Sequence, residues 1–218
     1  MHVEDIFGDL QTRLTSGEFD AGARLKPETF ATQYGCSAST IRDILYRLTT
    51  HGLASYLEQK GFRVPAISLS RRDDLTRFRI MLEAEGTCLS IRQGDIDWEA
   101  RLSAAHHRLS HIEKRVRDAG DRTAIFPIWS KAEFAFHNTL IEACGLNSLI
   151  TAHEMVYHQF RQQMITTDRD FAFLPETIAQ HEEILQAVLD RDQARARHTI
   201  TAHLSRSLTR SAPGGRSV

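Results

Sequence analysis

The sequence predicts a mainly α-helical protein, in which an N-terminal unit of three short helices with a small β-hairpin precedes a C-terminal all-α antiparallel helical bundle. Two observations support this fold class. The 218 residues include only 12 Gly and 5 Pro, and 8% are aromatic, which is typical neither of a disordered chain nor of a turn-rich β protein. Apolar residues also recur at helical spacing through most of the chain. At roughly 100–200 residues per domain, the length allows one large domain or two modest ones.

The overall charge excludes a bulk attraction to nucleic acid or membranes. The chain has 27 basic and 28 acidic residues, a formal net charge of −1, so any nucleic-acid site must be local. Its three cysteines are far apart and odd in number, which favours a reducing compartment. The N-terminus has no signal-peptide pattern, and no run of 18 apolar residues occurs. We therefore expect a soluble, cytoplasmic protein with no membrane partner.

Three short helices are expected in the first fifty residues. Apolar residues recur every three or four positions in the first and third, and glycines follow as stops. The expected helices are, in chain order, Val3–Leu14, Pro27–Tyr34 and Ser37–His51. Two brief strands, Leu53–Leu57 and Phe62–Val64, follow, with a turn between them.

Two short helices joined by a tight turn at Gly35 and followed by a hairpin are the parts of a winged helix-turn-helix. A helix fits the major groove, and a basic hairpin tip can lie along phosphates or in the minor groove. A small helical unit with a solvated polar face is the alternative. The candidate DNA contacts are the polar residues of the third helix and the hairpin tip: Ser37, Ser39, Thr40, Arg42, Arg47, Lys60, Gly61 and Arg63.

The remainder of the chain shows no convincing strand pattern. It divides into six helical stretches near residues 71–92, 96–118, 124–144, 147–167, 176–190 and 193–210, separated by Gly, Asn, Pro and Asp residues. The expected organisation is a DNA-binding domain at 1–66, a linker at 67–70, a helical metal- and ligand-sensing and dimerisation domain at 71–211, and a flexible tail at 212–218.

Three of these helical stretches each direct a histidine inward. His137 lies on an apolar stripe four residues after Glu133, and His181 and His203 complete the stripes of the last two helices. A single inward histidine is more often a hydrogen-bonded core residue. Three of them with a carboxylate favour a divalent metal in the bundle core, held by Glu133, His137, His181 and His203. This donor set suits zinc, our expected metal, and also nickel, manganese or iron.

A longer pattern covers the N-terminal unit. The run GEFDAGARLKPETFATQYGCSASTIRDILYRLTTHGLASYLEQKGFRV resembles the winged helix-turn-helix of GntR-type bacterial transcription regulators. The resemblance implies that Arg42, Arg47 and the wing segment 60–63 face DNA. Ala38 and Thr40 stand where the family usually has Arg and Pro, and Pro27 stands where it usually has an acid. Because Arg is a strong bidentate guanine reader, we expect an operator that departs from the common family sequence.

Residues 72–208 resemble the helical ligand-sensing domain, of the FCD type, found in the FadR subfamily of those regulators. The family's metal-binding pattern of an acid, a Phe-His pair and two later histidines is present, with Glu133 in place of the usual Asp. Arg79 and Glu83 match a pair in the family's first sensor helix, where the Arg can face the ligand; an ordinary ion pair is the alternative. The candidate effector contacts are Arg79, Asn147, His153 and Arg161.

We therefore predict a sequence-specific DNA-binding transcriptional regulator, specifically a repressor and not an enzyme. A small carboxylate effector at the metal would control its affinity for a double-stranded DNA operator, and a homodimer would read a pseudo-palindrome. One alternative is a metal-dependent enzyme acting on a small carboxylate, although no clear general base is partnered with a nucleophile. Another is a structural metal in a protein-binding bundle.

Overall fold

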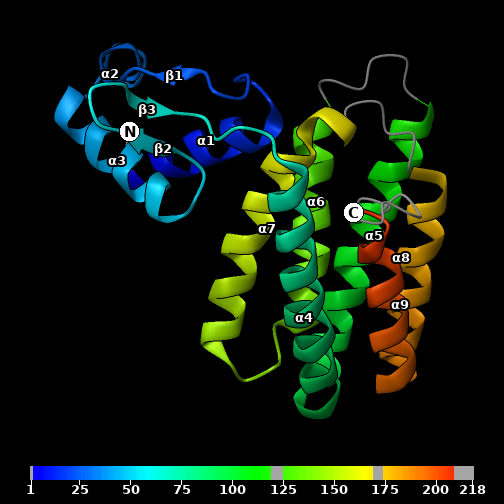
Figure 1. Cartoon of the computed structure of the whole chain (residues 1–218). Coiled ribbons are helices and arrows are strands. Elements are labelled where there is room, and N and C mark those ends of the chain that lie inside the picture. Colours follow the sequence, from blue (N-terminus) through cyan, green and yellow to red (C-terminus); the bar gives the residue numbers. More distant parts are fainter. Residues whose placement is uncertain (1, 119–124, 169–173, 209–218) are drawn as a thin grey trace, which may run out of the picture.

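The computed structural model describes all of the chain except residues 1, 119–124, 169–173 and 209–218. It confirms the mainly α-helical fold class, with a small N-terminal unit set at one end of a helical bundle (Figure 1). The expected helix break at Gly120 and the expected tail lie outside the described residues. No helix in the described part of the chain is long and apolar enough to cross a membrane.

The N-terminal unit contains three helices and three short strands. Its elements are α1 (Val3–Ser16), β1 (Arg24–Leu25), α2 (Pro27–Tyr34), α3 (Ala38–Thr50), β2 (Ser55–Leu57) and β3 (Gly61–Arg63). α2 begins with a proline and ends at Gly35, whose left-handed φ of 65° a side chain would strain. The Ser37 side chain caps α3 by accepting the Thr40 amide.

The sequence-based prediction missed strand β1 and placed the start of the first hairpin strand too early. β1 pairs with β3, in the sheet order β1-β3-β2, but two residues give no alternation to detect. The first hairpin strand begins at Ser55 instead of Leu53, because the amides of Leu53 and Ala54 bond back to the Leu48 carbonyl at the end of α3.

Six helices form the bundle. They are α4 (Leu69–Gln93), α5 (Ile96–Asp118), α6 (Phe126–Ile141), α7 (Asn147–Asp168), α8 (Leu174–Leu189) and α9 (Gln193–Ser205). α6 and α9 are shorter than expected, and the other four end within two residues of expectation. One hydrophobic cluster lies within residues 6–64 and a larger one within residues 84–204. Helix α1 packs on α7 and α6, so the N-terminal unit contacts the bundle directly.

Candidate metal centre and DNA-binding surface

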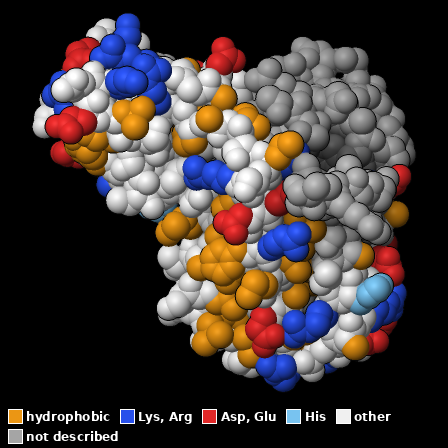
Figure 2. Space-filling model, in the orientation of Figure 1, with side chains coloured by type: hydrophobic (Ala, Val, Ile, Leu, Met, Phe, Trp, Pro, Cys, Tyr) orange, Lys and Arg blue, Asp and Glu red, His pale blue; other side chains and the backbone are white. Residues whose placement is uncertain are grey.

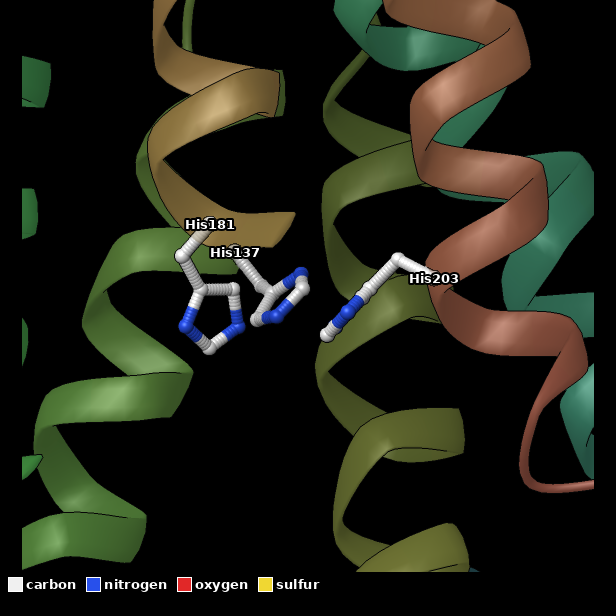
Figure 3. Close-up of side chains that lie close together, drawn as sticks. All are labelled: His137, His181 and His203. Carbon is white, nitrogen blue, oxygen red and sulfur yellow. The ribbon is translucent and has the colours of Figure 1, made fainter. Parts of the chain in front are cut away.

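The bundle brings three histidines together from three helices. His137 on α6, His181 on α8 and His203 on α9 point toward one another (Figure 3). One ring nitrogen of each lies within 4.8 Å of the others, and all three side chains are buried. Grouped imidazoles in a bundle core are a donor set for a divalent metal.

An oxygen faces Nδ1 of each imidazole from outside the cluster. His137 Nδ1 donates to Glu83 Oε2 at 2.7 Å, and His203 Nδ1 lies 3.0 Å from Gln180 Oε1. His181 Nδ1 lies 3.2 Å from Glu113 Oε1. His137 Nε2 and both ring nitrogens of His181 are buried and have no hydrogen-bond partner among the described residues. Buried polar atoms without partners are rare, so these nitrogens fit metal ligands.

The surroundings keep two of these rings uncharged. Burial lowers the pKa of His203 well below its usual value, and the neighbouring His181 and His137 lower it further. Burial also lowers the pKa of His137, against the opposing effect of Glu83. A neutral imidazole is the form that binds a metal.

Glu133, the fourth expected ligand, lies at the edge of the cluster. Its Oε1 is 3.4 Å from His137 Nε2 and 3.4 Å from Arg79 Nη2, and its Oε2 is 3.8 Å from Arg161 Nε. The Tyr157 hydroxyl donates to Oε2. Burial opposes ionisation of Glu133, but Arg161 and Arg79 outweigh it, so its pKa is below the ordinary value.

Glu83 links the metal-site histidine to two of the expected effector contacts. Its Oε1 accepts from Arg79 Nε at 2.5 Å and His153 Nε2 at 2.9 Å, while Oε2 accepts from His137. Arg79 therefore forms the ion pair with Glu83 that the sequence predicts as the alternative to a ligand contact. It also contacts Glu133. Arg161 is buried nearby, but Asn147 is exposed at the first residue of α7 and stays outside this buried group.

The expected DNA contacts differ in how far their side chains are bonded within the protein. Ser39, Arg42 and Lys60 are exposed, and Gly61 has a left-handed φ of 70° at the start of β3. Arg42 pairs with exposed Glu28 at 2.7 Å, a contact that competing phosphate can break. Lys and Arg side chains gather over this unit in Figure 2.

Four further expected DNA contacts make intramolecular bonds. Arg47 pairs with Glu4 of α1 at 2.8 Å and lies over the Phe7 ring. Arg63 donates to the Gly22 carbonyl at 2.9 Å. Ser37 and Thr40 are bonded to each other at the start of α3. The assignment of these residues to DNA stays a prediction.

Sequence reasoning overlooked several residues beside these sites. Arg24 and Lys26 line a pocket of about 240 Å³ together with Arg42 and Tyr56. Their signal was available, since both are basic and precede α2, but β1 was not predicted. The partners of the histidines, Glu83, Glu113 and Gln180, were not recognised as a set because they come from three different helices.

The end of α7 holds the DNA-binding unit through side-chain amides. Gln162 donates to the Leu53 carbonyl at 2.9 Å, and Gln163 contacts both the Ala66 carbonyl and the Ser68 amide. Gln162 and Gln163 are almost fully buried. We call these two residues the α7 amide pair. It contacts the backbone on both sides of the wing.

A glycine of the N-terminal unit lies in close contact with the bundle. Arg71 donates to the Gly52 carbonyl at 2.9 Å and to Gln159 Oε1 at 3.1 Å. A Cβ on Gly52 would lie 2.6 Å from the Gln159 side chain, and the Gly52 φ is 70°. Gly52 lies two residues after the end of α3, so α7 contacts the chain just beyond the helix that is expected to read DNA.

These features define the class of the protein. A winged helix-turn-helix is joined to a helical bundle that carries a buried polar cluster, which is the organisation of a DNA-binding regulator with a sensor domain. Residues 2–64 match the family described as bacterial regulatory proteins, gntR family, and residues 74–206 match the FCD domain. The chain therefore belongs to the GntR family of transcriptional regulators and carries an FCD domain, which confirms the resemblance to GntR regulators.

Similar proteins agree with this classification. The chain is 30% identical over 207 residues to BphR of Paraburkholderia xenovorans (strain LB400), an uncharacterized HTH-type transcriptional regulator, covering 95% of this chain and 84% of BphR. It is 28% identical over 199 residues to the HTH-type transcriptional repressor GlaR of Escherichia coli (strain K12), covering 89% of each. The structure of E. coli McbR/YncC shares the fold, with a TM-score of 0.79 at 21% identity over 94% of this chain and 93% of that chain. A GntR regulator from Rhodococcus sp. RHA1 gives 0.78 at 19% identity, covering 94% of each.

Proposed function

We propose that the protein is a homodimeric repressor of the FadR subfamily, which binds a double-stranded DNA operator in the bacterial cytoplasm and responds to a small carboxylate at a metal site. The observation that carries this proposal is the buried triad of His137, His181 and His203, inside a domain that contacts the DNA-binding unit. The GlaR relative is named a repressor, which supports the sign of regulation.

The three histidines would hold the metal, with Glu133 as the fourth ligand. Glu133 Oε1 lies 3.4 Å from His137 Nε2, so the two can chelate together. Zinc suits this donor set, and nickel, manganese and iron are the alternatives. The bound metal would supply a Lewis-acidic centre for an effector carboxylate.

Buried arginines support the choice of a carboxylate effector. Arg79 and Arg161 are 1% and 4% exposed, and both guanidinium groups face Glu133. Arginine binds carboxylates in a bidentate geometry, and burial strengthens the attraction. We propose that these two side chains and His153 line the effector site, with Asn147 at its outer limit.

An uncovered apolar face on α4 supports the proposed dimer. Phe78 and Met81 are 44% and 67% exposed one helical turn apart, and hydrophobic side chains gather over the bundle below the N-terminal unit in Figure 2. Exposed apolar patches mark interaction sites. We propose that a second copy of the chain packs on this face.

Arg42→Ala is expected to weaken specific operator binding by a factor of about 5–150, since one good base contact contributes about 1–3 kcal/mol. The measurement is fluorescence anisotropy with DNA from upstream of the protein's own gene, over a range of salt concentrations. Wild-type binding is expected to saturate at two chains per site and to weaken steeply with salt.

The matched control for Arg42 is Arg101→Ala, because Arg101 is also an exposed arginine paired with a glutamate but lies on the bundle. Its operator affinity should equal that of the wild type. Absence of any specific site, with or without zinc and a panel of small carboxylates, would reject the regulator proposal.

His181→Ala is expected to remove most of the bound metal. Elemental analysis of the wild-type protein should find about one divalent ion per chain, because the three imidazoles form a single cluster. Metal content that stays the same in the variant would reject this ligand set. His107→Ala, on the exposed face of α5, is the control and should retain the metal.

A metal-dependent enzyme acting on a small carboxylate remains the second candidate, favoured by the same histidine and carboxylate donors. The chain belongs to a family of transcriptional regulators, and this favours the regulator over the enzyme. Turnover of the carboxylate panel by the zinc-loaded protein would distinguish them.

A further inference from the structure

We infer that Glu113 is a positioning residue for the metal, which holds His181 and supplies the negative charge that makes the site selective for a cation. This inference rests on the proposed metal site at the three histidines. Glu113 comes from α5, which packs on α6 and α8 and contributes no histidine to the cluster.

The surroundings of Glu113 are unusual for a carboxylate. It is 0% exposed, and its Oε1 lies 3.2 Å from His181 Nδ1 and 3.4 Å from the indole nitrogen of Trp129, which donates to it. Oε2 has no hydrogen-bond partner, and no Arg or Lys in the described part of the chain forms an ion pair with Glu113. A buried carboxylate without a compensating cation is costly.

A metal on the far side of His181 removes this cost. When one imidazole nitrogen binds a metal, the other commonly donates to a carboxylate, which fixes the ring and increases its basicity. Both ring nitrogens of His181 are buried and have no hydrogen-bond partner among the described residues. Because Nδ1 lies 3.2 Å from Glu113 Oε1, we assign Nε2 to the metal and Nδ1 to Glu113. A cation on Nε2 would therefore compensate the Glu113 carboxylate through the His181 ring.

The acceptors on the other two histidines differ in this respect. Glu83 faces His137, but its charge is already balanced by Arg79 at 2.5 Å. Gln180 faces His203 and is neutral. Of the three acceptors, only Glu113 combines a negative charge with the absence of a cationic partner in the described structure. We therefore expect Glu113 to contribute more to metal affinity than Glu83 or Gln180 does.

The test is a comparison of zinc affinity between wild type and Glu113→Gln in the full chain. Glutamine keeps an oxygen for His181 but removes the charge. The expected zinc affinity is about 10–100-fold lower, measured by competition with a chromophoric chelator. Glu182→Gln, an exposed carboxylate on α8 near His106, is the matched control and should bind zinc like the wild type.

Thermal unfolding of the metal-free proteins separates positioning from a purely structural role. Because its charge is uncompensated without metal, Glu113→Gln should leave the metal-free midpoint unchanged or raise it, while the midpoint increase caused by zinc becomes smaller. A lowered metal-free midpoint, or zinc affinity within twofold of wild type, would overturn the inference. A wild-type protein that binds no zinc would instead reject the proposed metal site.

Discussion

Glu83→Ala should lower the free energy of unfolding of the protein by about 3–5 kcal/mol, the typical cost of removing one partner from a buried ion pair. The Glu83 side chain is fully buried and accepts from Arg79, His137 and His153. Its removal leaves the Arg79 guanidinium with Glu133 alone, at 3.4 Å. Denaturant titration of the metal-free protein, followed by circular dichroism, measures the effect.

Glu85→Ala is the matched control for this prediction. Glu85 lies on the same helix and pairs with Arg197 at 2.7 Å, but both side chains are half exposed. An exposed pair typically contributes no more than about 1 kcal/mol. Equal losses in the two variants would mean that the buried network does not stabilise the bundle.

The stability difference between wild type and Glu83→Ala should also depend on pH. Burial opposes ionisation of Glu83, but Arg79 and His137 outweigh it, so its pKa lies well below 4.5 in the folded protein. A carboxyl group with a lowered folded-state pKa stabilises the fold above its unfolded pKa and loses that contribution as the pH falls. The difference should therefore be full at neutral pH and shrink below about pH 4.5.

The helices could be predicted because the signals for a helix lie within its own stretch of sequence. α3 has a serine cap, an apolar stripe and a terminal glycine, all within sixteen residues. β1 could not be predicted, because two residues become a strand only through pairing with β3 almost forty residues later. Register between distant segments is a tertiary property and leaves no periodic trace in the sequence.

The site divides in the same way. The inward positions of His137, His181 and His203 followed from helical stripes, and the structure brings them together. Glu113 also follows Leu109 at helical spacing. Its role could not be inferred from the sequence, because it depends on His181, which lies on another helix. The helix position of Arg47 also predicts a contact with DNA, and the ion pair of its exposed side chain with Glu4 of α1 could not be foreseen, because the two residues lie 43 positions apart.

Helix α7 carries side chains that contact both the buried polar cluster around Glu133 and the backbone on either side of the wing. Tyr157 donates to Glu133 on the sensor side, and one to two turns later the α7 amide pair bonds to the DNA-binding unit. A ligand can shift an equilibrium only through a difference in its contacts between two states. A displacement of α7 at Glu133 would change the contacts of the amide pair, and we therefore expect α7 to couple the proposed effector site to operator binding.

The double variant Gln162→Ala with Gln163→Ala should uncouple the two units. Allosteric coupling typically amounts to about 1–3 kcal/mol, a factor of about 5–150 in affinity. In the variant, the change in operator affinity caused by zinc with the best carboxylate of the panel should fall below about threefold. Zinc affinity should stay at the wild-type value, because neither amide contacts the three histidines.

Gln186→Ala provides the comparison for the amide pair, since Gln186 is an exposed glutamine on α8 that bonds only to Glu182. It should keep the full response. The double variant leaves backbone carbonyls that these amides now bond without their donors. A buried acceptor without a donor costs about 1–3 kcal/mol, so the double variant should also unfold at a lower temperature. An unchanged effector response in a destabilised double variant would assign the amide pair to stability alone. The coupling route would then lie in α1, the helix of the N-terminal unit that packs on α7.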